Sequence, residues 1–400
     1  MAFVPERLVQ APLTLGCETE HLLAQAESAV RSLSGISDDL PAISRFLLRS
    51  EAIASSRIEG IAPSARQVAL AELGQREAVQ GISAPAQMVA NNMTLVREAT
   101  TRLVHAPLVT VGDVVELHRS LLRDEPHHHG IRTVQNWIGG SDWHPMDADF
   151  VPPSPERVAA TMGDLVDYMN GASHAPIVQA ALVHAQFETI HPFTDGNGRV
   201  GRALVHSVLT RRGLTPDSVL PVSLVLSTLR ERYVDGLQTF REAGATGTAR
   251  SGREEWIAFF AEVTLLASEQ ATQLSSELAE IRDEWTERLA GSRQLRGAQR
   301  ALRSDSATAL ILADLVGTPV LTVDTAQRIH GVSRVAAQRA LDELHTAEIL
   351  TRRSIGSGRD AYVSGDVLDL ITWAERRLAS TKFDTRKAPP RHGVPAPPER

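Results

Sequence analysis

The amino-acid sequence is poor in several features that define other classes of protein. Its 400 residues contain one cysteine, Cys17, which excludes an internal disulfide framework and is compatible with a reducing compartment. Aromatic residues make up only 4%, while alanine and leucine are abundant, and this composition favours helices over a β-sandwich. The net charge is −7, so no overall positive field draws the chain to nucleic acid or to a membrane. We therefore expect a mostly α protein.

The sequence also lacks any apolar run long enough to span a bilayer. Its first ten residues, MAFVPERLVQ, do not show the basic segment followed by an apolar stretch that marks a secretory signal. A chain of this length has room for two or three domains and a sizeable core. These features predict a cytoplasmic protein with no membrane partner.

The most informative segment is HPFTDGNGRVGR at residues 191–202. Apolar residues recur at helical spacing before it, in residues 177–190, and again after its glycines, so we expect a loop between two helices. The amides at a glycine-rich helix N-terminus have no partners within the helix and form a seat for phosphate. Arg199 and Arg202 lie on one face of the second helix, where they can reach further phosphate oxygens. The segment therefore predicts an anion site with a base, His191, beside it.

This segment resembles the signature of the Fic (Fido) family, His-x-Phe-x-Asp/Glu-Gly-Asn-Gly-Arg-x-x-Arg. Every defined position is matched, and the matching residues are His191, Phe193, Asp195, Gly196, Asn197, Gly198, Arg199 and Arg202. The same run also fits the glycine pattern of dinucleotide-binding proteins, but that pattern requires a preceding strand, and here we expect a helix. A degenerate, inert copy of the Fic signature is the remaining alternative.

The resemblance implies a nucleotidyltransferase, a protein adenylyltransferase that moves AMP from ATP to a Ser, Thr or Tyr hydroxyl of a target protein. In that role His191 takes the proton of the attacking hydroxyl, which suits an imidazole that titrates near neutral pH. Asp195 would hold the cofactor Mg²⁺, because hard cations prefer carboxylate oxygens. Phe193 is expected to fill the core beneath the loop. A second aromatic residue that the family often has after Tyr233 is absent, since Val234 stands there. The residues expected to contact ATP are Gly196, Asn197, Gly198, Arg199, Val200, Gly201, Arg202 and Tyr233.

A second segment, SSRIEG at residues 55–60, resembles the inhibitory motif of the family, Ser/Thr-x-x-x-Glu-Gly/Asn. The resemblance implies that Glu59, carried by a helix packed against the site, pairs with Arg202. A carboxylate in the guanidinium fork removes a ligand of the γ-phosphate and repels that phosphate. We therefore expect an autoinhibited enzyme, and removal of AMP with Glu59 orienting a water is an additional option. The alternative is an ordinary helix end with Gly60 as its left-handed cap.

A third segment, residues 131–140, resembles the substrate-positioning flap of the family, because β-branched and aromatic residues close on a Gly-Gly turn. Residues 150–151 can return as the second strand of a hairpin. An exposed hairpin edge binds a target peptide by strand addition, so we expect the target protein along this flap. A plain surface hairpin is the alternative. The flap residues expected to position the target are Asn136, Trp137, Ile138 and Gly139.

Breaks in pattern divide the chain into five parts. Residues 1–105 are expected to form an N-terminal helical region that carries the inhibitory motif, and residues 106–266 the Fic catalytic domain. A flexible connection is expected at residues 243–247. The remaining parts are a connecting helix at residues 267–300, a winged-helix domain at 301–380 and a proline-rich tail, expected to be disordered, at 381–400.

The expected winged helix contains a first helix at residues 322–329, a recognition-type helix at 333–348 and a β-wing at 351–363. Acidic residues share the recognition-type helix and prevent a basic stripe, so we favour a protein-contact or dimerisation module, which leaves a homodimer as an option. The alternative function is a nucleotide-sensing, DNA-binding regulator or scaffold, and the intact His191 argues against it because sensing needs no base. DNA reading would use Arg334, Arg339, Arg352, Arg353 and Arg359.

Histidines at two further places in the sequence are expected to have a structural role and not to bind a metal or a substrate. Residues 127–129 are three consecutive histidines whose side chains diverge, and we expect a solvated loop rather than a metal site. His184 lies one heptad before His191, and we expect a hydrogen-bonded core residue.

Overall fold

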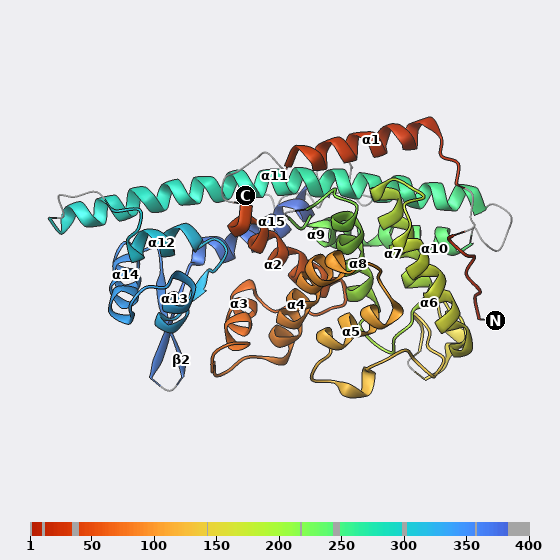
Figure 1. Cartoon of the computed structure of the whole chain (residues 1–400), viewed down its shortest axis with the longest axis horizontal. Helices are drawn as coiled ribbons and strands as arrows, with labels where there is room; N and C mark the ends of the chain where they lie inside the picture. Colours follow the sequence, from red (N-terminus) through yellow and green to blue (C-terminus); the bar gives the residue numbers. More distant parts are fainter. Residues whose placement is uncertain are drawn as a thin grey trace, which may run out of the picture.

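The computed structural model of the chain describes residues 2–9, 13–33, 40–141, 143–216, 218–242, 249–297, 302–356 and 358–382. Within these residues the protein is almost entirely helical, with one three-stranded sheet near the C-terminal end. Figure 1 shows the long helix α11 (Ala249–Leu295) along one side of the molecule, with most other helices gathered beneath it. The mostly α architecture expected from the composition is confirmed.

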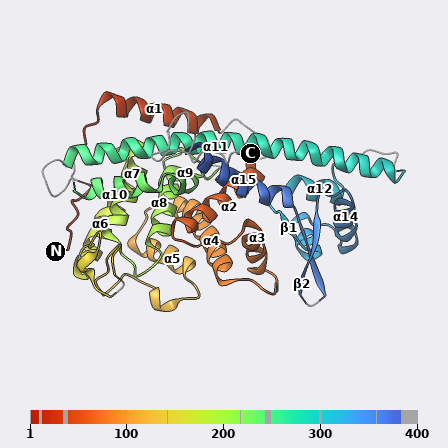
Figure 2. The ribbon, with the colours of Figure 1, turned by 180° about the vertical axis from the view of Figure 1, so that it is seen from behind.

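The N-terminal region forms α1 (Cys17–Ser32), α2 (Leu40–Ile58), α3 (Ala65–Gly74) and α4 (Ala84–His105). Local sequence sets the start of α3, because Ser64 and Gln67 cap each other's backbone amides in a capping box. Helix α2 turns Phe46 and Ile53 into the core, where both are at most 1% exposed. Helix α1 is separate from the other three and lies along α11, on the side away from them (Figures 1 and 2).

Six helices form the middle of the chain: α5 (Val111–Leu121), α6 (Pro155–Asn170), α7 (Pro176–Ile190), α8 (Asn197–Arg211), α9 (Val222–Thr228) and α10 (Arg230–Glu242). Two short 3₁₀ helices, η2 (Pro126–His128) and η3 (Pro145–Asp147), lie between α5 and α6. Every residue of α7 is buried, which is typical of a helix surrounded by others. Helix α8 packs against both α7 and α4. The loop that joins α7 to α8, residues 191–196 (the central loop), is therefore anchored at both ends by buried helices.

Helix α11 has 47 residues and, at the usual rise per residue, is about 70 Å long. It buries Trp256 near one end and Trp285 near the other, both 0% exposed. The helix is continuous across residue 266, where we expected the catalytic domain to give way to a connector. None of the helices in the described residues combines the length and apolarity needed to cross a membrane.

The C-terminal unit contains α12 (Ala307–Asp314), β1 (Val320–Leu321), α13 (Val323–His330), α14 (Arg334–Thr346), β2 (Thr351–Gly356), β3 (Arg359–Val363) and α15 (Gly365–Lys382). The sheet is antiparallel in the order β1-β3-β2, with Val320 opposite Val363 and Arg352 opposite Tyr362. Gly331 has a φ of 64°, the left-handed conformation that lets α13 stop and α14 start in another direction. Two helices followed by a hairpin is the order that we expected for a winged helix.

The expected flap pairs less than the sequence suggested. Ile138 and Phe150 form an isolated antiparallel bridge, with amide-to-carbonyl distances of 2.9 and 3.2 Å, rather than two regular strands. The turn contains η3, and Gly139 and Gly140 both have positive φ, so the chain leaves the ladder after one pair. The expected flexible connection at residues 243–247 and all but the first two residues of the expected tail at 381–400 lie outside the described residues.

A buried polar network joins α2 to α8 and α9. Glu51 on α2 is 1% exposed, and its carboxylate lies 2.9 Å from Nε2 of His206 on α8. The backbone amide of Ser223 donates to the same carboxylate at 2.8 Å, and the Ser223 hydroxyl donates as well. A buried carboxylate is tolerated only where donors surround it, and here three donors do so. The network therefore fixes α2 on the two helices that follow the central loop.

We predict that Glu51→Ala lowers the free energy of unfolding by about 3 kcal/mol, because it leaves buried donors without an acceptor. Glu116→Ala is the matched control: Glu116 is 49% exposed and, among the residues that the structure describes, pairs with Arg119 alone, so its loss costs about 0.5 kcal/mol or less. Urea unfolding followed by tryptophan fluorescence measures both. Equal losses for the two variants would show that the network does not stabilise the fold.

Candidate active site

The loop between α7 and α8 turns twice through the left-handed region. His191, at the C-terminal end of α7, has a φ of 48°, and Gly196, at the start of α8, has a φ of 78°. A non-glycine residue in this conformation is strained by about 1–3 kcal/mol and persists only where the surroundings impose it. Arg132 Nε donates to the His191 carbonyl at 2.9 Å, and Asn136 Nδ2 donates to it at 3.3 Å. The loop conformation is therefore imposed from the flap side.

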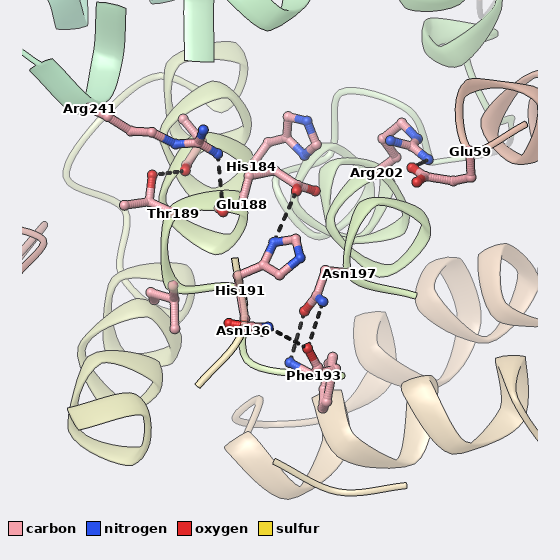
Figure 3. Close-up of polar contacts among 12 residues, drawn as sticks. Glu59, Asn136, His184, Glu188, Thr189, His191, Phe193, Asn197, Arg202 and Arg241 are labelled. Carbon is pink, nitrogen blue, oxygen red and sulfur yellow. Dashed lines mark hydrogen bonds and ion pairs between the residues drawn. The ribbon is translucent and has the colours of Figure 1, made fainter. Parts of the chain in front are cut away.

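The Asn197 side chain holds the loop through two hydrogen bonds to the Phe193 backbone. Its Oδ1 accepts from the Phe193 amide and its Nδ2 donates to the Phe193 carbonyl, both at 2.9 Å (Figure 3). The Phe193 ring is 0% exposed and stacks on His118 with ring centroids 3.8 Å apart, as expected for a residue that fills the core beneath the loop. Because both side-chain atoms of Asn197 are engaged, this side chain shapes the loop. Contact of Asn197 with ATP, which we expected through its side chain as well as its amide, stays a prediction.

Two glycines of the segment are required by close packing. A Cβ at Gly198 would lie 2.1 Å from a Glu59 carboxylate oxygen, and one at Gly201 would lie 2.7 Å from a Glu188 carboxylate oxygen. These distances are far shorter than any real Cβ contact, so a side chain at either position would displace a carboxylate. The glycines thus let the first two turns of α8 approach two acidic residues, Glu59 and Glu188, from other parts of the chain.

The Arg199 side chain is buried and keeps hydrogen-bond donors that an anion can use. It is 2% exposed, and its Nη2 donates to Asp195 at 3.1 Å. Its Nε and Nη1 are buried and have no hydrogen-bond partner within the described part of the chain. A buried guanidinium with two unused donors, beside the free amides of a helix N-terminus, is a site for a phosphate group.

The residues around Asp195 fit a magnesium ion. The Asp195 side chain is 44% exposed, and only one of its oxygens is engaged, by Arg199. Mg²⁺ in nucleotide enzymes is bound by one or two carboxylates together with phosphates and waters, and a single half-exposed carboxylate beside a phosphate seat suits this pattern. The Asp195 carbonyl oxygen is held separately, 3.0 Å from His118 Nε2.

Glu59 and Arg202 meet as the inhibitory motif predicted. Arg202 is 2% exposed, and its Nη2 donates to Glu59 at 2.7 Å and to the Ser55 carbonyl at 2.9 Å. Its Nε donates to the Ser55 hydroxyl at 3.0 Å. Burial raises the pKa of Glu59, but the charge and hydrogen bond of Arg202, together with the nearby Arg199 and His191, outweigh it and leave the pKa below its usual value. The end of α2 therefore occupies the guanidinium fork of Arg202 with an ionised carboxylate (Figure 3).

His191 is held as a neutral base. Burial, with the charge of Arg241 adding to it, lowers the pKa of His191 to about 4, so the imidazole is unprotonated at neutral pH. Its Nδ1 lies 3.8 Å from Oε2 of Glu188, which is itself 6% exposed (Figure 3). Burial raises the pKa of Glu188 to about 7, and its Oε1 has no hydrogen-bond partner within the described residues. A base and a carboxylate thus lie in reach of each other.

The sequence analysis did not select Glu188, although a signal was present. Glu188 is the only acidic residue in α7, a helix that is otherwise apolar or neutral and is buried on all sides. Arg132 and Arg241 were missed as well. Arg241 lies over the Phe150 ring of the flap at 4.0 Å and donates to the Glu188 carbonyl at 3.2 Å, so it joins the flap to α7.

The side chains of Tyr233, Asn136 and Trp137 form hydrogen bonds within the protein that we did not expect. Tyr233 is 4% exposed, and its hydroxyl lies 2.9 Å from Nε2 of His184, which confirms His184 as a hydrogen-bonded core residue. Contact of Tyr233 with adenine stays a prediction. In the flap, Trp137 Nε1 donates to the Ser141 carbonyl at 2.7 Å, and Asn136 holds the central loop. Placement of a target by Asn136, Trp137, Ile138 and Gly139 also stays a prediction.

The expectation of a plain solvated loop at the three histidines is wrong in part. His128 and His129 are half-buried, and His128 Nδ1 lies 2.8 Å from the Thr194 hydroxyl of the central loop. Glu125 belongs to the same turn, and ligand atoms of Glu125, His127 and His128 all lie within 4.8 Å of one another. Glu125 is the carboxylate that the sequence interpretation overlooked. It stands three residues before His128, and the 3₁₀ helix η2 brings the two side chains together.

Comparisons with known proteins agree with this site. The Fic/DOC family model matches residues 108–209, and the Fic/DOC family N-terminal model matches residues 21–101. The chain therefore contains both parts that these family models describe, within residues 21–209. Two solved structures share the fold: a Fic family protein from Desulfovibrio desulfuricans G20 (TM-score 0.53, 21% identity, 89% of this chain and 98% of that one) and a Fic domain containing signaling protein from Bacteroides thetaiotaomicron VPI-5482 (TM-score 0.52, 22% identity, 64% and 97%).

Curated relatives carry an activity in their names. Protein adenylyltransferase fic-1 of Caenorhabditis briggsae is 33% identical over 165 residues, which cover 38% of this chain and 31% of that protein. Protein adenylyltransferase Fic of Aedes aegypti is 29% identical over 226 residues, which cover 53% of this chain and 41% of that protein. The chain thus matches between about a third and two-fifths of the length of these relatives.

The site makes a prediction about pH. Glu188 has a raised pKa of about 7 in the folded protein, against 4.5 for an ordinary glutamate, so the folded state is stabilised by protonated Glu188 and loses that stabilisation as pH rises from 4.5 through 7. We predict that Glu188→Gln, which cannot ionise, gains melting temperature relative to wild type between pH 5 and pH 8. Calorimetry at both pH values measures the difference. A difference that does not change with pH, as expected for the exposed control Glu116→Gln, would contradict the raised pKa.

Proposed function

We propose that this chain is a protein adenylyltransferase that moves AMP from ATP to a Ser, Thr or Tyr hydroxyl of a target protein. The observation that carries the proposal is a neutral imidazole, His191, on the same loop as a phosphate seat with unused donors on Arg199. A protein that only senses nucleotides needs the seat but not the base. The printed names of the relatives support the same activity.

The proposed reaction is a displacement at phosphorus. The target hydroxyl oxygen forms a bond to the α-phosphorus of ATP while the bond from that phosphorus to the bridging oxygen of the β-phosphate breaks, and diphosphate leaves. His191 takes the hydroxyl proton, because only a neutral base can accept it. Arg199 and the amides at the start of α8 stabilise the negative charge on the phosphates. Mg²⁺, held by Asp195, would supply further neutralisation of that charge.

Glu188 positions the base in this proposal. Its carboxylate lies on the Nδ1 side of the His191 ring, which leaves Nε2 to face the hydroxyl. When His191 receives a proton, a positive charge forms in a buried place, and an adjacent carboxylate stabilises it. The same logic applies to any base that is oriented by a third group.

The resting enzyme is autoinhibited in this proposal. Glu59 fills the Arg202 fork at 2.7 Å, so the γ-phosphate finds a carboxylate where its guanidinium ligand would be. ATP bound in spite of this would not present its α-phosphate in line with the hydroxyl. Release of the end of α2 is then the step that activates transfer. Removal of AMP, with Glu59 orienting a water, remains a second direction for the same site.

The C-terminal unit is proposed as a protein-contact module rather than a DNA reader. Several arginines that could read DNA are engaged internally: Arg334 pairs with Asp324, and Arg352 pairs with Asp360. Arg359 donates to the Ala78 carbonyl of the N-terminal region. Cations that are already engaged within the protein contribute little to binding a phosphate backbone. A homodimer formed through this unit remains part of the proposal.

We predict that His191→Ala abolishes transfer while ATP binding changes less than threefold, because the base acts only when the hydroxyl loses its proton. Labelling of a cell lysate with radioactive ATP measures transfer, and calorimetry measures binding. Glu116→Gln, an exposed change outside the nucleotide seat, controls for unspecific effects of a substitution. Transfer that persists in His191→Ala would remove His191 from the reaction.

We predict that Glu59→Gly raises automodification and target labelling tenfold or more, since one charge-assisted pair is worth about 1.5–3 kcal/mol and about 1.4 kcal/mol is tenfold in rate. The double variant Glu59→Gly with Arg202→Ala should lose most of the gain, because the freed guanidinium is gone. Glu59→Gln, which keeps a hydrogen-bonding group but not the charge, should lie between wild type and Glu59→Gly.

Two outcomes of this experiment would redirect the assignment. If Glu59→Gly binds ATP but labels no more protein than wild type, Glu59 is not inhibitory. If the variant is impaired in removing AMP from a labelled target, Glu59 belongs to a hydrolytic site.

A further inference from the structure

A cavity of about 310 Å³ lies where the N-terminal helices meet the C-terminal unit. Its walls come from α2, α3, α4, the segment before β1, and α13. Figure 1 shows α3 between α4 and the C-terminal unit, and Figure 2 shows the same order from behind. No residue of the central loop lines this cavity, so it is distinct from the candidate active site.

The cavity is lined by many more cations than anions. One acidic residue, Glu72, faces five basic ones, which are Arg45, Arg49, Arg76, Arg97 and Arg328. These arginines come from four different elements: α2, the turn after α3, α4 and α13. Like charges brought together by folding repel one another, so a cluster of this kind needs a counter-charge.

The protein supplies only part of that counter-charge. Arg45 pairs with Asp314, and Arg49 pairs with Glu72 at 2.8 Å. The side chains of Arg76, Arg97 and Arg328 form no ion pair or hydrogen bond with any residue that the structure describes. Three guanidinium groups therefore remain available in one cavity.

Arg49 gives an independent indication that an acceptor is missing. This side chain is 1% exposed, and its Nη2 donates to Glu72 and, at 3.1 Å, to the Gly317 carbonyl. Its Nη1 is buried and has no hydrogen-bond partner in the described residues. A buried charged donor without an acceptor is unfavourable, and an anion in the cavity that Arg49 lines would relieve it.

We propose that this cavity binds a small phosphorylated molecule. Its volume lies at the lower end of the range for small-molecule pockets, which suits a ligand about the size of a nucleotide or a sugar phosphate. The planar guanidinium fork matches phosphate oxygens in bidentate fashion, and three free forks suit a group with several negative charges. Apolar walls from Leu48, Leu73, Met93, Val320 and Ile329 would cover the uncharged part of the ligand.

The ligand would touch the helix that carries the inhibitory glutamate. Helix α2 presents Arg45 and Arg49 to the cavity, and the turn directly after its other end presents Glu59 to Arg202. The C-terminal unit contributes Arg328 to the same cavity, so occupancy joins that unit to α2. This site does not depend on adenylyl transfer and is tested without an activity assay.

The test is calorimetric titration of sodium tripolyphosphate into the full chain at about 50 mM salt, where phosphate contacts are strong. The double variant Arg97→Ala with Arg328→Ala should bind at least tenfold more weakly than wild type. The double variant Arg303→Ala with Arg119→Ala is the matched control, because it also removes two positive charges, and these side chains are 81% and 51% exposed and pair with Asp305 and Glu116. The control should bind as wild type does.

Two further variants separate this cavity from the active site and from misfolding. Arg199→Ala damages the phosphate seat of α8 and should leave binding to the cavity intact. Arg76→Ala changes an exposed side chain on a turn, so it should fold normally and still weaken binding several-fold. Citrate, a carboxylate of similar charge, should bind at least tenfold more weakly than tripolyphosphate.

Three results would overturn the proposal. Binding that is lost in Arg199→Ala but retained in Arg97→Ala with Arg328→Ala would place the anion in the active site. Equal affinity of wild type and Arg76→Ala, with both folded by circular dichroism, would exclude the arginine cluster. Citrate binding as tightly as tripolyphosphate would show a general anion site rather than a phosphate site.

Discussion

The ion pair between Glu59 and Arg202 is the contact on which the arrangement of the candidate active site depends. Its partners stand 143 residues apart, one at the end of α2 and the other in the second turn of α8. Both helices are held in place by Glu51 and His206, which form a second polar contact between the same two helices. Gly198 has no side chain, which leaves room for the Glu59 carboxylate. A change in how α2 lies on α8 therefore reaches the anion site directly.

The base is controlled by burial rather than by a charge partner. His191 ends the helix that is most deeply buried in the molecule, and desolvation is the largest influence on its pKa. The same desolvation raises the pKa of Glu188 to about 7. The pKa of this glutamate therefore lies above that of His191, which is the reverse of the usual order. Arg132 of the flap and Arg241 of α10 donate to backbone carbonyls in this region, and Arg241 also lies over the Phe150 ring of the flap. The flap and the base are thus parts of one hydrogen-bonded assembly.

The C-terminal unit is attached to the inhibitory helix along its length. Arg45 pairs with Asp314, Arg49 donates to the Gly317 carbonyl, and Arg57 pairs with Glu375 on α15 at 2.6 Å. These contacts begin at the start of α2 and end two residues before Glu59. Because an ion pair or a ligand at either end acts on one continuous helix, this attachment offers a route by which the C-terminal unit influences the active site.

The sequence by itself determined the features that depend on neighbouring residues. The signature from His191 to Arg202 predicted a loop between two helices with an anion seat, because glycine conformation and helix capping are local properties. It also predicted the Glu59–Arg202 pair, but only through the resemblance to a family. The antiparallel pairing of the flap was predicted, but its length was overestimated. Two glycines with positive φ end the pairing after one bridge.

Only the tertiary structure decided which side chains share an environment. Glu188 looks like an ordinary residue of an apolar helix until burial brings its carboxylate beside the imidazole and removes water from both. The arginines of the cavity come from four elements, and no spacing in the sequence relates Arg76 to Arg328. Burial and long-range contact arise when helices pack, and packing depends on the whole chain rather than on any one segment.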